Sequence, residues 1–86
     1  MTNQEKTLAA PEVLLGALAS AVVTRRMQLN MSQDDLCKRS ALNRSLVARV
    51  EAGLLDADVQ MLWRLSTALD TTIGELLEMA ETELGY

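Results

Sequence analysis

Apolar side chains recur at the three- and four-residue spacing of a buried helix face in five stretches of the chain. The first stretch starts at Pro11, which suits the first turn of a helix, and ends at Asn30, which tolerates the left-handed conformation of a helix end. Its apolar positions are Leu14, Leu15, Leu18, Val22 and Leu29. Because these positions cover more than one face of the helix, we expect Leu14 and Leu15 to be available to a second chain.

Two short helices joined by a tight turn are predicted within residues 31–53. Ser32 is placed to cap the first of them, and Asp35 is placed to complete a capping box. Asn43 is placed to cap the second helix. Only two residues, 41 and 42, remain for the connection, so we expect the helices to cross steeply, as in a helix-turn-helix.

The second short helix has two chemically different faces. Val47 and Val50 share the face that we expect to be buried. The opposite face carries Arg44, Ser45, Ala48 and Arg49. Small residues allow a close approach to a surface, and an arginine can donate two parallel hydrogen bonds to a guanine edge in the major groove of DNA. This outer face is therefore a candidate for nucleic-acid recognition.

Two further helices are predicted after an acidic loop, in which Asp56 or Asp58 is placed to cap the next helix. The inward positions of that helix are Val59, Leu62, Leu65, Ser66 and Leu69. Thr72 and Glu75 form a second capping box, followed by Ile73, Leu76, Leu77 and Ala80 as apolar positions of the last helix. The pattern predicts an all-α, five-helix domain over residues 11–86, with a flexible N-terminal tail at residues 1–10.

Positive charge is concentrated in residues 25–49, although the whole chain has a net charge of −4. Residues 1–24 sum to −1, residues 25–49 to +4 and residues 50–86 to −7. An acidic remainder would turn the basic segment toward a polyanion such as nucleic acid and repel that polyanion elsewhere. A solvated basic surface without a partner explains the charges equally well, and only the turn geometry favours the first interpretation.

Catalysis and metal binding have few suitable residues in this sequence. The chain has no histidine, no glycine-rich phosphate loop and no cluster with metal-ligand spacing, so we expect neither an enzyme nor a metal or other cofactor. The single cysteine, Cys37, is expected to pack in the core and suits a reducing compartment. Since no secretory signal and no apolar run of ~20 residues is visible, we expect a cytoplasmic protein without a membrane segment.

A more specific pattern extends over most of the chain. It consists of Arg26, Met31-Ser32-Gln33, Leu36, Leu42, Val47, Val50-Glu51, Gly53, Leu62, Leu65, Ala68-Leu69, Ile73 and Leu76-Leu77. At this spacing the sequence resembles the Cro/lambda-repressor-like (XRE) family of bacterial and phage helix-turn-helix proteins. The resemblance implies the five-helix lambda-repressor-like fold, with the helix-turn-helix at the second and third helices.

The resemblance also implies roles for particular residues. Bases of double-stranded DNA would be contacted by Arg44, Ser45, Arg49 and Gln33, and phosphates by Asn43, Arg39 and Lys38. Arg26 and Glu51 would form a structural ion pair between the first helix and the end of the third. Ala41 replaces a glycine that is common in the turn of relatives, which predicts modest strain if that residue is left-handed.

The resemblance further implies a homodimer, because one recognition helix spans too few base pairs to be specific. Two recognition helices ~34 Å apart would read a palindromic operator. Relatives dimerise through the C-terminal helix, so the candidate interface residues are Trp63, Leu76, Met79, Ala80, Leu84 and Tyr86. For Trp63, a place at the edge of the core is an equal alternative, because so large a ring is seldom completely buried. The predicted function is a transcriptional regulator that acts as a repressor. The alternative is an antitoxin or another protein-interaction module that binds its partner through the acidic C-terminal half.

Overall fold

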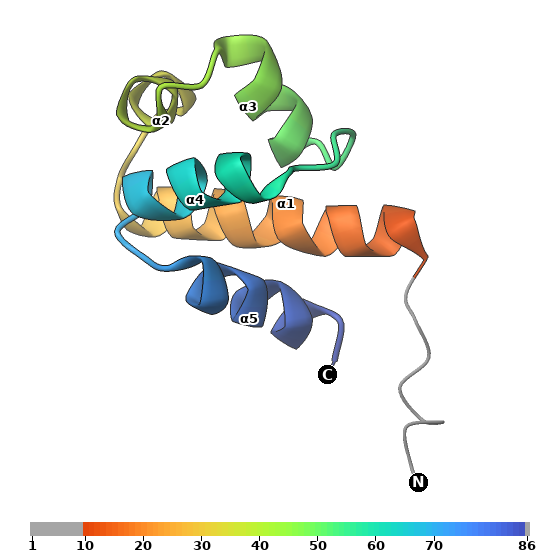
Figure 1. Cartoon of the computed structure of the whole chain (residues 1–86). Helices are drawn as coiled ribbons and strands as arrows, with labels where there is room; N and C mark the ends of the chain where they lie inside the picture. The colour runs from red at the N-terminus through yellow and green to blue at the C-terminus, as the bar shows by residue number, and fades with distance from the viewer. Residues whose placement is uncertain (1–9, 86) are drawn as a thin grey trace, which may run out of the picture.

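The computed structural model describes residues 10–85 and forms five helices with no strand in that range. The helices are α1 (Pro11–Gln28), α2 (Gln33–Ser40), α3 (Arg44–Glu51), α4 (Val59–Ala68) and α5 (Ile73–Glu83). Figure 1 shows α2 and α3 together on one side of α1 and α5 on the other side. The contacts agree, since α1 packs against both α3 and α5. The predicted all-α class is confirmed, and the predicted tail lies outside the described residues except for Ala10, the N-cap of α1.

The side-chain caps predicted from the sequence form at the starts of four helices. Ser32 with Asp35 and Thr72 with Glu75 make capping boxes, Asn43 caps α3, and Asp58 caps α4. The hydrogen bonds from the Ser32 backbone and hydroxyl hold the pKa of Asp35 below its ordinary value. Hydrogen bonds from the Thr71 hydroxyl and the Thr72 backbone lower the pKa of Glu75 in the same way. These caps satisfy backbone N–H groups that a helix start otherwise leaves without partners.

Four helices end with a left-handed residue just beyond the C-cap, and in α5 this residue is Gly85. Asn30, Gly53 and Asp70 have φ angles of 54°, 73° and 55° and follow α1, α3 and α4. The next N–H in each case bonds back across the final turn, for example from Leu54 to the Arg49 carbonyl at 2.9 Å. At position 53 the positive φ favours glycine, whereas a Cβ there would make only an ordinary van der Waals contact, 3.5 Å from the Gly16 Cα of α1.

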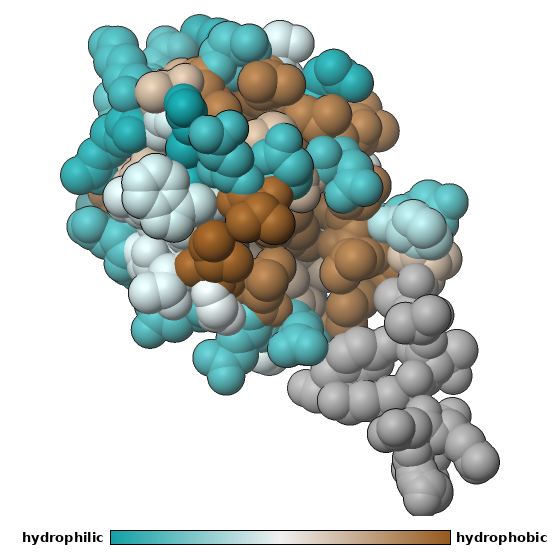
Figure 2. Space-filling model, in the orientation of Figure 1, coloured by the Kyte–Doolittle hydropathy of each residue, from teal (hydrophilic) through white to brown (hydrophobic). Residues whose placement is uncertain are grey.

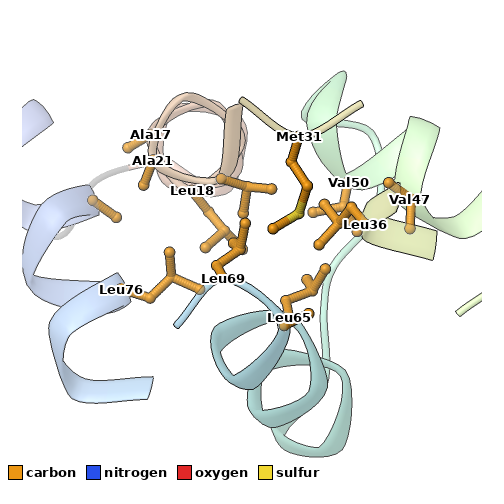
Figure 3. Close-up of a cluster of buried hydrophobic side chains, with 13 residues drawn as sticks. Ala17, Leu18, Ala21, Met31, Leu36, Val47, Val50, Leu65, Leu69 and Leu76 are labelled. Atoms are coloured by element: carbon orange, nitrogen blue, oxygen red, sulfur yellow. The ribbon is translucent and has the colours of Figure 1, made fainter. Parts of the chain in front are cut away.

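An aliphatic core fills the space between the five helices. Figure 3 shows its side chains converging from every helix and from Met31. Its largest fully buried side chains are those of Val22, Leu36, Val47, Val50, Leu65, Ser66, Leu69 and Leu76. Cys37 packs at the edge of this core, as predicted. Hydrophobic burial among these helices is therefore the main term that holds the helix-turn-helix in place.

The register of α5 and the start of α4 differ from the predictions. Leu76 and Ala80, predicted as interface residues, are 0% and 1% exposed in the core of the same chain, so they have no surface to offer a partner. They lie one turn apart on the face of α5 toward α1, whereas Leu77, another of the predicted apolar positions of this helix, is 38% exposed. Val59 is also not inward but 73% exposed, because it is the first residue of α4 and extends past the core.

Candidate nucleic-acid interface

Helix α3 presents the polar face that the sequence predicts. Val47 and Val50 are buried, while Arg44, Ser45 and Arg49 are exposed on the other side of the helix. Residues four apart on a helix lie on the same face, so Ser45 and Arg49 are neighbours on this surface. The arrangement gives a basic ridge with a short side chain at its centre. Such a ridge has the size and charge to enter the major groove.

A nearly buried ion pair fixes the end of α3 to α1. The Arg26 Nε and Nη2 donate to the two carboxylate oxygens of Glu51 at 2.7 and 3.0 Å, and Nη1 donates to the Met31 carbonyl at 2.8 Å. The side chains of Arg26 and Glu51 are only 17% and 5% exposed. The hydrogen bond to Glu51 raises the pKa of Arg26 above its ordinary value despite the opposing effect of burial. The predicted structural ion pair is confirmed.

Gln33, the first residue of α2, is part of the same network. Its Nε2 donates to Glu51 Oε1 at 2.9 Å, and the side chain is half-buried. The Glu51 carboxylate therefore accepts hydrogen bonds from α1 and from α2, while it belongs to α3. The predicted base contact of Gln33 stays a prediction, and it would have to be made by the atoms that Glu51 leaves free.

Arg44 has a partner that was not predicted from the sequence. Its Nη1 donates to Asp34 Oδ1 across the turn, in an ion pair whose side chains are 68% and 56% exposed. Asp34 therefore restrains one end of the guanidinium, and the remaining N–H groups stay available. The sequence contains one signal for this contact, because Asp34 and Arg44 have opposite charges and lie on either side of the predicted turn.

The three residues predicted to contact phosphates do not all lie beside the basic ridge of α3. Asn43 lies at the start of α3, where its Oδ1 caps the helix at 2.8 Å from the Leu46 nitrogen and its amide N–H groups remain free. Lys38 and Arg39 are exposed in the last turn of α2. Arg39 lines two surface hollows, one with the α1–α2 turn and one with α4, and neither includes a residue of α3. Contact of Lys38 and Arg39 with phosphates stays a prediction.

Two other arginines have structural roles that the charge count did not reveal. The Arg25 Nε and Nη2 donate to the carbonyls of Leu69 and Asp70 at 2.9 and 3.2 Å, so Arg25 caps the end of α4. Arg64 Nη1 donates to the Ala41 carbonyl at 3.3 Å, which links α4 to the turn of the helix-turn-helix. Ala41 has the left-handed conformation, with φ at 59°, that was expected to strain this turn.

The other predicted interface residues have different degrees of exposure. Trp63 is 59% exposed on α4, which leaves most of the ring available. Met79 and Leu84 are half-buried against the core of their own chain. Tyr86 lies outside the described residues. Of the original set, Trp63 is thus the residue with a large free apolar surface.

Among the described residues, no group of three or more potential metal ligands occurs. Within the same part of the chain, no helix is both long and apolar enough to cross a bilayer.

A tight two-helix unit held on a helical core, with a basic and exposed second helix, defines a helix-turn-helix DNA-binding domain. The helix-turn-helix family model (HTH_3) matches residues 24–76, which is more than half of the chain. The chain belongs to this family, the XRE-type helix-turn-helix proteins, whose members are DNA-binding transcriptional regulators and not enzymes.

Solved structures show the same fold. The restriction-modification controller protein C.Esp1396I is 22% identical with a TM-score of 0.76, and the alignment covers 83% of this chain and 91% of that chain. The clp gene regulator ClgR from Corynebacterium glutamicum is 19% identical with a TM-score of 0.79, with 84% of this chain and 77% of that chain covered. No match was found among curated proteins.

Proposed function

We propose that the protein is a repressor that binds a palindromic operator as a homodimer, with Arg44, Ser45, Arg49 and Gln33 at the bases. The observation that supports this most is the orientation of α3, whose arginines are exposed while its valines are buried. Repression requires only that the bound protein block access to a promoter. As a regulator of bacterial or phage genes, the protein would act in the cytoplasm.

Selection of bound sequences from a random DNA pool, at two salt concentrations, tests this function. We expect an inverted repeat whose half-sites are about one helical turn apart. Arg49→Ala should relax base preference at one position by ~1–3 kcal/mol. Lys38→Ala should weaken binding to all sequences alike and reduce the salt dependence. Recovery of no sequence preference by the unaltered protein would contradict the proposal.

The homodimer is supported by apolar surface on α4 and α5. Val59 and Trp63 lie one turn apart on α4, and Leu77 is exposed on α5, which packs against α4. Figure 2 shows hydrophobic side chains gathered over these two helices. Monomeric proteins rarely expose a large contiguous apolar patch, so a second copy is the occupant that we propose. Sedimentation should show a dimer, and Trp63→Glu should shift it toward a monomer without loss of helicity.

A second candidate is an antitoxin or interaction module, favoured by the acidic surface of α5. Glu78, Glu81 and Glu83 are exposed, and none forms an ion pair within the described residues. A basic partner protein would neutralise these carboxylates. Co-purification of a stoichiometric partner, lost when Glu78 and Glu81 are changed to lysine, would support this function. Retention of the partner by that variant would contradict it.

A further inference from the structure

We propose that Glu51, besides stabilising the fold, is a positioning residue for base recognition. It orients the Gln33 amide so that the operator base that Gln33 contacts is adenine. The inference rests on the proposed operator binding and names the base that one residue selects. It starts from a network that connects α1, α3 and α2 through one carboxylate.

The chemistry of the network determines which end of the Gln33 amide points inward. Both carboxylate oxygens of Glu51 accept hydrogen bonds from the Arg26 guanidinium, and a carboxylate in such an ion pair only accepts hydrogen bonds. The Gln33 Nε2, 2.9 Å from Glu51 Oε1, must therefore face the carboxylate. A rotated amide would place its own oxygen against Glu51 and lose the bond to a carboxylate that is 5% exposed.

The atoms left over on Gln33 define the partner. One N–H is used by Glu51, so the groups that Gln33 has left for a partner are the acceptor Oε1 and the second N–H. The major-groove edge of adenine offers the complementary pair, a donor at N6 and an acceptor at N7. Guanine offers two acceptors there, and its O6 would face the Gln33 oxygen. An amide free to rotate could turn its nitrogen toward guanine, whereas the amide held by Glu51 cannot.

The test releases the amide while keeping Gln33 in place. The double variant Arg26→Met/Glu51→Leu removes both charges together and retains apolar volume, a replacement that proteins often tolerate. Gln33→Met in the otherwise unaltered protein identifies the operator position that depends on the amide. Competition binding then compares the selected operator with duplexes that carry each of the other bases at that position.

We expect the unaltered protein to prefer adenine over guanine by about tenfold at this position. The double variant should lower that ratio to within about twofold, while the base preference that depends on Arg49 is retained. A double variant that folds, binds the operator and keeps the original ratio would overturn the inference. If the unaltered protein selects no operator, the proposed function fails instead, which is a separate outcome.

A measurement on the unaltered protein covers the case in which the double variant does not fold. In the NMR spectrum, the two Nε2 protons of Gln33 should differ in exchange with solvent, because one donates to the carboxylate of Glu51 and the other does not. Slower exchange of one proton supports the held orientation. Equal, rapid exchange of both protons, like that of the exposed Gln60, would overturn it.

Discussion

Loss of the Glu51 carboxylate should be among the most destabilising single changes to this chain. Glu51→Ala removes both bonds to the guanidinium and the acceptor for Gln33, and it leaves the Arg26 charge 17% exposed with only the Met31 carbonyl as a partner. Removal of one member of a buried ion pair costs about 3–5 kcal/mol. The total free energy of unfolding of such a domain is only about 5–15 kcal/mol, so a large part of the stability would be lost.

Thermal and urea unfolding followed by circular dichroism would measure this effect. A domain of this size loses about 4–8 °C of melting temperature per kcal/mol, so we expect a decrease of at least about 12 °C. The matched control is Arg44→Ala, which breaks the exposed pair with Asp34 and should cost about 1 kcal/mol or less. If Glu51→Ala cost no more than this control, the nearly buried network would not be stabilising and the reasoning would be refuted.

Three other changes have defined outcomes. Ala41→Gly should raise the free energy of unfolding by about 0.5–1 kcal/mol, because glycine adopts the left-handed φ of 59° without a Cβ clash; a decrease in urea unfolding would contradict this. Asp34→Asn should steepen the salt dependence of binding to random DNA by about one phosphate contact, a slope change of ~0.9, because its arginine partner is released. The control Glu81→Gln makes an equal charge change on an exposed residue of α5 and should leave the slope of the salt dependence unchanged. Identical slopes for the two variants would contradict the idea that Asp34 restrains Arg44. The folded pKa values of Asp35 and Glu75 lie below the ordinary 3.8 and 4.5, so their stabilising effect should be complete above pH 4.5 and decline as the pH falls through those folded values. Replacing Asp35 with asparagine and Glu75 with glutamine should make the melting temperature fall less steeply at acidic pH. An unchanged fall would contradict the role given to these two carboxylates.

Features whose partners lie within one helical turn were predictable from the sequence. The caps at Ser32, Asn43 and Thr72 each involve a backbone N–H three residues on, so the local pattern contains all the information needed. The two faces of α3 follow from the same short-range spacing. The Arg26–Glu51 pair spans 25 residues and was predicted only because the sequence resembles a family in which it occurs.

The contacts that were missed depend on how distant helices pack. Arg25 bonds to a carbonyl 44 residues away and Arg64 to one 23 residues away, and nothing in their local sequence points to those partners. The buried face of α5 could not be predicted from the local sequence for a similar reason. Leu76 and Leu77 are adjacent and equally apolar, so periodicity alone does not decide which of them faces α1. The packing of α5 against α1 decides it, and this in turn excludes Leu76 from any subunit interface.

The bond from Arg64 to the Ala41 carbonyl joins the helix that carries Trp63 to the turn that orients α3. If two copies meet through α4, the separation of their DNA-reading helices depends on this bond and on the packing of α4 against α2. A protein built in this way would tolerate little variation in the number of base pairs between half-sites. Inserting one base pair at the operator centre rotates one half-site by about a tenth of a turn, a misalignment that such a dimer could not follow.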